Sequence, residues 1–309
     1  MTRRRPKRLL LVALVAVAAI AAAWLWHFHR DYAAQFLARR GRLTDNRQQL
    51  IAATARTTTF DVWLHGDGGL EVDARMRVPN RDGKYAGVLL AVGLETGRRV
   101  IDLLEEHDNL VELAVDYGWQ GEFDITSVPK FARTAGRMRT LSMEAVPRLL
   151  LALEFLARQP QVDTNRIVVV GVSYGSYLAT PAAALEPRVS RLLLVQGGGT
   201  IREVTAATAR RWRSPLPPRM TGWFCETVFT AFEPERWIGV VAPRKVTFIA
   251  SRADPDFPVT AVERVYAAAG EPKELVWHDT PHVAPDAAEI IGELSRVVLQ
   301  ELGAESTTQ

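Results

Sequence analysis

Hydrophobic and polar residues change their spacing partway along the chain. Alternating positions at 58–65 and 69–78 predict two strands, and the glycine-rich turn at 65–69 joins them into a β-hairpin. A third apolar run follows at 85–93. Beyond it, short apolar runs alternate with helical segments, which is typical of a parallel sheet with crossover helices. The later strands are predicted at 109–115, 166–172, 190–196, 245–251 and 273–278, with helices near 97–106, 143–158, 174–185, 259–269 and 287–302.

Two segments depart from this alternation. The segment 31–58 is rich in Ala, Arg and Gln with helical periodicity, so we expect a helical stalk or lead-in before a main domain at 59–304. The segment 197–244 between two predicted strands is much longer than a simple crossover requires. A Pro-rich turn at 214–218 and several large aromatic residues predict a helical cap insertion there. These aromatics either line an apolar site beneath the cap or fill the core of the cap itself.

The segment 1–30 has the composition of a membrane anchor or a signal peptide. Five cations and no acidic residue precede an uncharged run at 9–26, which nearly spans a hydrocarbon core. The cations favour a cytoplasmic N-terminus, and Trp24 and Trp26 suit the far membrane interface. The alanines at 21–23 also fit the cleavage site of a signal peptide. Both interpretations place the main domain outside the cytoplasm, membrane-anchored or secreted, and we favour the uncleaved anchor.

Composition excludes several other classes of protein. With 309 residues, of which 48% are hydrophobic, the chain is large and apolar enough for a substantial core. The net charge of +3 comes from the N-terminus, because the residues after position 8 carry 33 cations against 35 acidic groups. No basic cluster with interleaved aromatics follows, so we predict no nucleic-acid partner. Cys225 is the single cysteine, so no intramolecular disulfide is predicted, and no Cys/His spacing resembles a zinc site.

The sequence Gly171-Val172-Ser173-Tyr174-Gly175 stands directly after a predicted strand and directly before an Ala-rich helix. Its two glycines permit a sharp strand-to-helix turn that lifts the serine hydroxyl out of the sheet. The N-terminus of the helix behind it favours developing negative charge. Ser173 is therefore the candidate nucleophile.

A serine hydroxyl needs a general base oriented by a carboxylate, and in this architecture both follow the serine in the chain. Only His278 and His282 follow Ser173. His278 ends a predicted strand, whereas His282 lies in the next loop, where its imidazole can reach across the strand ends, so we predict His282. The acid is Asp254 or Asp256, which share the loop after the strand at 245–251.

With the nucleophile, acid and base in this order, the sequence resembles the α/β-hydrolase family, particularly its dienelactone-hydrolase-like and acyl-esterase branch. The resemblance covers about residues 60–302. The resemblance rests on GVSYGS at 171–176, VDTNRI at 162–167, APRKV at 242–246, DPDFP at 254–258 and DTPH at 279–282. It implies an α/β-hydrolase fold: a mostly parallel sheet with flanking helices, an N-terminal hairpin and a short cap insertion.

The resemblance also implies roles for individual residues. In the family's pattern the triad aspartate precedes a proline by four positions, which selects Asp254. The family's oxyanion hole consists of two backbone amides, here those of Tyr174 and Leu94. The chain departs from the pattern at Pro281, where glycine is usual, and at Ser173, where dienelactone hydrolases have cysteine.

The expected activity is acyl transfer from an ester to water through Ser173, His282 and Asp254, with a small-molecule acyl substrate. This chemistry implies no metal or organic cofactor. An amidase, a peptidase or a thioesterase would use the same residues, because a fold does not determine a substrate. An alternative from another class is a non-catalytic envelope protein that uses the fold to bind a ligand.

Overall fold

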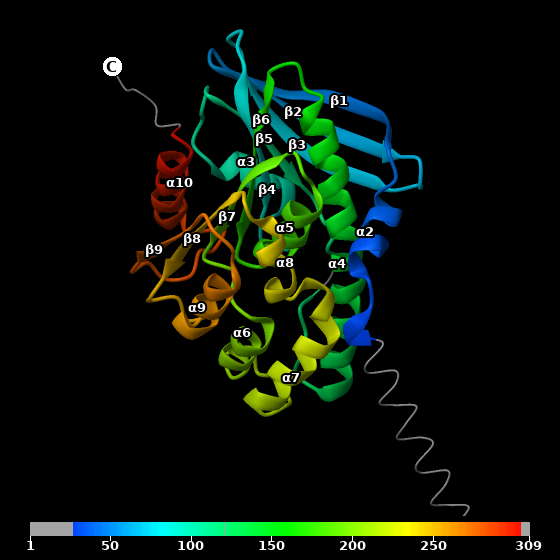
Figure 1. Cartoon of the computed structure of the whole chain (residues 1–309), viewed down its shortest axis with the longest axis vertical. Coiled ribbons are helices and arrows are strands. Elements are labelled where there is room, and N and C mark those ends of the chain that lie inside the picture. The colour runs from blue at the N-terminus through cyan, green and yellow to red at the C-terminus, as the bar shows by residue number, and fades with distance from the viewer. Residues whose placement is uncertain (1–26, 121, 304–309) are drawn as a thin grey trace, which may run out of the picture.

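The computed structural model describes residues 27–120 and 122–303, so the predicted anchor at 9–26 lies outside the described residues. Within the described ranges, no helix is both long and apolar enough to cross a membrane. A nine-stranded sheet runs through this part of the chain in the order β1-β2-β3-β5-β4-β6-β7-β8-β9 (Figure 1). Its strands are β1 (Leu43–Ala53), β2 (Thr57–Gly66), β3 (Glu71–Pro79), β4 (Tyr85–Ala91), β5 (Leu110–Val115), β6 (Val162–Val172), β7 (Val189–Val195), β8 (Lys245–Ser251) and β9 (Lys273–His278).

The sheet has an antiparallel part and a parallel part. β1 to β3 pair antiparallel, and β3 also lies antiparallel to β5. From β5 through β4, β6, β7 and β8 to β9, every neighbouring pair is parallel. The parallel strands are continuous apolar runs because helices cover both of their faces. Their carboxyl ends therefore lie along one edge of the sheet, which is where such folds place their functional loops.

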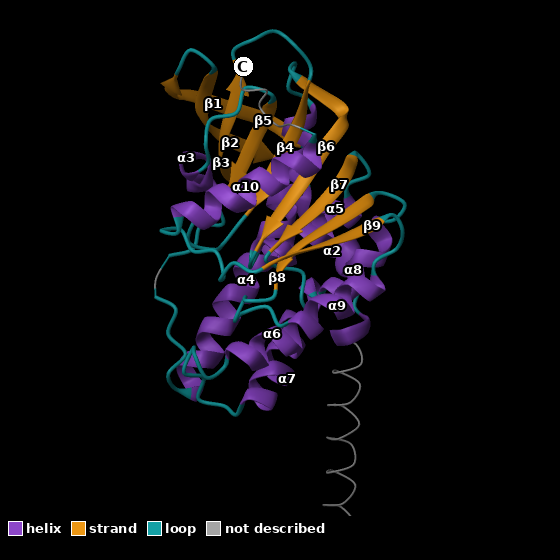
Figure 2. Cartoon of the chain, turned by 90° about the vertical axis from the view of Figure 1, so that its left-hand side faces the viewer, coloured by secondary structure: helices purple, strands orange, loops and turns teal. Residues whose placement is uncertain are grey.

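Helices cover the two faces of the sheet unequally. One face packs against α4 (Val128–Ala157), α5 (Gly175–Leu185) and their neighbours, and this side holds the larger apolar core. Among the described residues, the other face carries only the short α3 (Val100–Leu103) and the longer α10 (Ala288–Leu302), over a smaller core. In Figure 2, α10 crosses in front of the strands. This thinner layer leaves room between sheet and helix.

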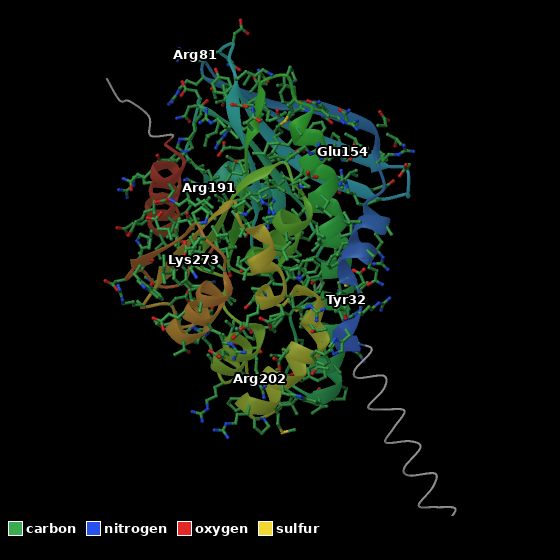
Figure 3. All side chains as sticks on the ribbon, in the orientation of Figure 1. Tyr32, Arg81, Glu154, Arg191, Arg202 and Lys273 are labelled. Carbon is green, nitrogen blue, oxygen red and sulfur yellow. The ribbon has the colours of Figure 1, made fainter. Side chains whose placement is uncertain are left out.

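The predicted helical lead-in at 31–58 is only partly helical. α2 (Tyr32–Arg40) is a helix that packs along α4, and Figure 3 labels Tyr32 on α2 and Glu154 on α4. Arg40 donates a hydrogen bond to Glu154 at 3.0 Å. The next segment is β1, so the helical prediction is wrong for Leu43–Ala53. All residues of β1 after Leu43 are exposed, so no buried face distinguishes a helix from a strand in the sequence. The segment is a strand because its backbone forms hydrogen bonds with β2.

Two predicted helices differ in length from the observed ones. α4 begins at Val128, well before the predicted start at 143, and includes Pro147. The helix expected at 97–106 is a 3₁₀ turn at Gly97–Arg99 followed by the single turn α3. α3 ends early because the guanidinium of Arg77 donates hydrogen bonds to three backbone carbonyls at this point. The acceptors are Ile101, Leu104 and Glu105, at 3.2, 3.3 and 2.9 Å.

The insertion after β7 folds into α6 (Ile201–Thr208), α7 (Pro218–Phe229), a 3₁₀ turn at Thr230–Phe232 and α8 (Pro234–Val241). Its aromatics divide between the two expected roles. Phe232 and Trp237 are buried and pack on Phe36 of α2, with ring centroids 5.9 and 6.0 Å apart. Trp212 is 36% exposed and faces the site described below. α9 (Val259–Ala268) then packs beside α8.

Candidate active site

Ser173 sits in a strained turn between β6 and α5. Its φ is +53°, a value that residues other than glycine rarely adopt. The flanking glycines make this turn possible. A Cβ on Gly171 would lie 2.6 Å from the Ala179 side chain, and one on Gly175 would lie 2.0 Å from the carbonyl oxygen of Ala91. Strand, turn and helix therefore pack too closely for any side chain at the two glycine positions.

The structure brings Ser173, His282 and Asp254 into one hydrogen-bonded series. Ser173 Oγ lies 2.8 Å from His282 Nε2, and His282 Nδ1 lies 2.7 Å from Asp254 Oδ2. A carboxylate only accepts hydrogen bonds, so Nδ1 carries the proton and Nε2 is left to accept from the serine hydroxyl. The series links residues that are 109 and 28 positions apart in the chain. With this tautomer, His282 can act as a base toward Ser173.

Asp254 and the ring of His282 are held firmly in place. The Asp254 side chain is 1% exposed, and its second oxygen accepts the amides of Asp256 and Phe257 at 2.7 and 3.2 Å. The Phe257 ring stacks on the imidazole at a centroid distance of 5.7 Å. The carboxylate therefore stays in a fixed position behind the base.

Asp256, the other candidate acid, lies on the opposite side of the ring. Its Oδ2 is 3.9 Å from His282 Nε2, the nitrogen that faces Ser173, and its carboxylate pairs with Arg211. His278, the other candidate base, ends β9, and within the described chain its Nε2 has no hydrogen-bond partner. The hydrogen-bond geometry therefore favours Asp254 over Asp256 as the acid and His282 over His278 as the base.

Gln196 is a site residue that the sequence analysis missed. It follows β7 directly, is 1% exposed and has a φ of +42°. Its side-chain amide donates to the carbonyl of Pro281 at 2.8 Å and accepts from the amide of Val283 at 2.6 Å. The only sequence signal was a polar residue ending an apolar strand before three glycines. Its partners lie far along the chain, so the sequence pattern could not reveal them.

The two amides expected for an oxyanion hole border the same space as the serine. Tyr174 is the residue after Ser173, and Leu94 follows β4, whose end touches the start of α5 at Gly175. Among the described residues, neither backbone N–H has an assigned acceptor. Both can therefore serve as donors to an oxygen bound beside Ser173.

A cavity of about 530 Å³ opens beside Ser173. Tyr174 and Leu94 border its mouth, together with Phe123 and Trp212, whose rings meet edge to face at 5.7 Å. A second, smaller cavity of about 100 Å³ lies beneath the cap on the other side of Tyr174. Burial raises the pKa of Tyr174 to about 12, so its hydroxyl stays neutral and bonds to Ser142 at 2.6 Å.

Burial raises the pKa of two further carboxyl groups, those of Glu112 and Glu233. Glu112 lines the large cavity, and burial raises the pKa of its carboxyl although Arg77 lies 2.6 Å away. Glu233, at the start of α8, caps α6 through the amide of Ile201 at 3.2 Å. Burial raises the pKa of Glu233 to about 8.

One cluster has the geometry of a candidate cation site. Oxygen and nitrogen atoms of Asp254, Asp256 and His282 lie within 4.8 Å of one another. The same atoms form the hydrogen-bonded series with Ser173, so a cation there would compete with the contact between His282 and the serine. The expectation of a cofactor-free site stays a prediction.

No protein-family model and no curated protein sequence matches the chain. Solved structures with similar folds include an acetyl xylan esterase from Paenibacillus sp. R4, with a TM-score of 0.65 and 17% identity over 88% of this chain and 93% of that one. Acetyl xylan esterase 1 from Thermoanaerobacterium sp. JW/SL YS485 gives 0.59 and 15%, over 88% and 94%. A cold-adapted esterase from an Arctic intertidal metagenomic library gives 0.59 and 15%, over 84% and 99%. The sheet order, the turn at Ser173 and these neighbours agree with the prediction: the chain has the α/β-hydrolase fold.

Proposed function

We propose that this protein is a serine hydrolase that cleaves carboxylic esters. The observation that carries the proposal is the hydrogen-bonded series from Ser173 through His282 to Asp254, beside two unused amides and an open cavity. Such a series is the arrangement that activates a serine hydroxyl for attack on an acyl carbon.

In the first half of the reaction, Ser173 Oγ attacks the ester carbonyl while its proton moves to His282 Nε2. Asp254 stabilises the resulting imidazolium through Nδ1. The amides of Tyr174 and Leu94 donate to the tetrahedral oxyanion, and one such donor is typically worth about 100- to 1000-fold in rate. The bond from carbon to the alcohol oxygen then breaks, and His282 returns the proton to the departing alcohol.

In the second half, His282 takes a proton from water as the water oxygen attacks the acyl-enzyme. Collapse of the second tetrahedral intermediate releases the carboxylic acid, and the proton returns from His282 to Ser173 Oγ. Each half thus begins and ends with His282 neutral. No step needs a metal or an organic cofactor.

Two of the neighbours are named for acetyl xylan, which makes acetylated carbohydrate one candidate substrate. Amides, peptides and thioesters present the same acyl carbon to Ser173, so they belong in the substrate panel. Ligand binding without turnover of any of them would favour the non-catalytic envelope protein instead.

The test is hydrolysis of p-nitrophenyl acetate and longer esters by the full-length chain, together with labelling by a fluorophosphonate. Ser173→Ala should lose labelling and reduce turnover to near background. Ser190→Ala is the matched control, because that hydroxyl donates to the carbonyl of Ile167 at 2.8 Å and lies on β7 away from the site. Hydrolysis by Ser173→Ala at the parent's rate would eliminate the serine mechanism.

We also propose that the catalytic domain is held outside the cytoplasm by the segment 9–26. The proposal rests on its uncharged run and the preceding cations. A reporter fused after Gln309 should be extracytoplasmic, and the full chain should stay in washed membranes. A mature N-terminus near Trp24 would show cleavage of a signal peptide instead.

A further inference from the structure

The cavity beside Ser173 extends far beyond the catalytic residues, between the sheet and the thin helical layer on its second face. On the sheet side, Val88, Leu90 and Val92 of β4 and the loop after it alternate along one face, as do Val170 and Val172 of β6. On the other side, α10 contributes one helical face: Ile291, Leu294, Ser295, Val298, Leu299 and Leu302. The cavity is therefore a slot between two regular walls.

The slot is long. Its α10 wall runs from Ile291 to Leu302, which is about 16 Å at the rise of a helix. On the sheet it reaches from Val92 down to Leu110, which pairs with Ala86, a distance of about 20 Å along the strands. This length accommodates the whole extended acyl chain of laurate, whereas an acetyl group would fill only the mouth.

The far half of the slot is suited to hydrocarbon. Most of its lining is aliphatic. The one acidic group on the sheet wall, Glu112, forms an ion pair with Arg77 at 2.6 Å. His107 also lines this half and is 7% exposed. Because burial and the Arg77 charge lower the pKa of His107, its imidazole is neutral at neutral pH. Among the described residues, this half of the slot thus offers no free charge to bind a second carboxylate or a phosphate.

The wall formed by α10 is fastened to the sheet at its far end. Glu301 accepts hydrogen bonds from Lys245 at 3.5 Å and Thr247 at 3.4 Å, and its backbone carbonyl accepts from Arg191. Figure 3 shows Arg191 on the side of α10 that faces the sheet. These ties hold α10 over β7 and β8, while the slot lies under its other side.

The position of His282 decides which part of an ester occupies the slot. The departing alcohol takes its proton from His282 Nε2 and must leave beside that ring. At its mouth the slot is bordered by Ser173 and the oxyanion residues Leu94 and Tyr174. The backbone after the base, 283–285, also lines it, but the His282 ring itself does not. The acyl chain therefore points into the slot, and the alcohol faces the side of Asp256.

We propose that the slot between β4, β6 and α10 binds the acyl chain of a medium- to long-chain ester, so that the physiological substrate is lipid-like in its acyl part. This proposal rests on the proposed ester hydrolysis. Each buried methylene adds up to about fourfold in affinity. The kcat/KM of the full-length protein should therefore rise at least about tenfold from p-nitrophenyl acetate to the octanoate and laurate.

The first test narrows the slot from α10. Val298→Phe and Ser295→Phe place a ring in the slot, and both should lower the ratio of laurate to acetate kcat/KM at least about tenfold. Val297→Phe is the matched control, because Val297 neighbours Val298 on α10 but does not line the slot. Thermal unfolding and fluorophosphonate labelling verify that each variant is folded with a reactive serine. A chain-length profile that is flat in the parent, or equal in Val298→Phe and Val297→Phe, would overturn the proposal.

The second test measures binding without catalysis. Ser173→Ala should bind the fluorescent fatty acid cis-parinaric acid, laurate should displace it and acetate should not. Adding Val298→Phe should abolish this binding, and adding Val297→Phe should leave it intact. If acetate is hydrolysed but no fatty acid binds, the acyl-chain proposal fails while the proposed function stands. If fatty acid binds in the slot but no ester is cleaved and no probe labels Ser173, the proposed function fails alone.

Discussion

Gln196 holds the backbone on both sides of His282, donating to the Pro281 carbonyl at 2.8 Å and accepting from the Val283 amide at 2.6 Å. A third bond, to the Thr280 hydroxyl at 2.9 Å, ties the same loop. These three bonds set where the backbone that carries His282 lies. The distance from His282 to Ser173 therefore depends on a glutamine that bonds to neither side chain.

We predict that Gln196→Ala lowers kcat by about 100-fold, because a displacement of the base by about 1 Å costs that much. KM should change little, since Gln196 does not line the substrate cavity. Gln161→Ala is the control: it removes a similar bond, from Gln161 to the Pro79 carbonyl at 3.3 Å, far from the site. An equal loss of kcat in both variants, measured with p-nitrophenyl esters, would mean that Gln196 has only a general structural role.

The two aspartates of the acid loop should differ sharply. Asp254→Asn removes the acceptor at 2.7 Å from His282 Nδ1 and favours the wrong tautomer, so kcat should fall by up to about 10,000-fold. Asp256→Asn should keep most of the activity, with both variants folded by circular dichroism. The reverse ranking would transfer the role to Asp256. Two mild effects would direct attention to Asp279, which precedes His282 in the same loop.

The elbow should tolerate no side chain at its second glycine. In Gly175→Ala the new Cβ would lie 2.0 Å from the Ala91 carbonyl, so we expect a loss of at least about 3 kcal/mol in the free energy of unfolding. Gly136→Ala on the exposed side of α4 has nothing within 4 Å and should gain about 0.5–1 kcal/mol instead. Urea unfolding of both variants measures the contrast, and equal stabilities would contradict the close packing at the elbow.

Glu233 should make stability fall as pH rises. Its pKa in the folded protein is about 8, above the ordinary value of 4.5, so between these two pH values the folded state binds more protons than the unfolded state. The free energy of unfolding then decreases by up to about 1.4 kcal/mol per pH unit from this group alone. Its contribution is fully present below pH 4.5 and is lost by about pH 8.

Glu233→Gln should remove this slope. The variant and the parent should have equal stability near pH 4, and the variant should be the more stable by a growing margin up to pH 8. Glu263→Gln, on the exposed side of α9, serves as the control in the same urea titrations. A constant difference between Glu233→Gln and the parent at every pH would contradict the buried, protonated state of Glu233.

Much of the fold is a local property of the sequence. Runs of consecutive apolar residues predict the parallel strands, because strands covered on both faces have few polar positions. The elbow at Ser173 is equally local, since its glycines, strand and helix are consecutive in the chain. The choice of His282 over His278 followed from the place of each residue relative to the end of a strand.

The remaining features depend on contacts between segments that are distant in the chain. β1 became a strand because its backbone pairs with β2, although its side chains are exposed like those of a surface helix. Asp254 and Asp256 are two positions apart in one loop, and only the three-dimensional path of that loop puts one 2.7 Å from Nδ1 and the other 3.9 Å from Nε2.

A sequence pattern predicts neither the hydrogen bonds from Gln196 to the His282 loop nor the slot under α10. Both arise where β7, β4 and α10, which are far apart in the chain, come together around one edge of the sheet. Hydrophobic periodicity reports that a residue is buried, but not which residue buries it. The sequence by itself therefore determined the parallel strands, the elbow and the order of the candidate residues, whereas the tertiary structure decided the state of β1, the partners of the candidate residues and the shape of the space beside Ser173.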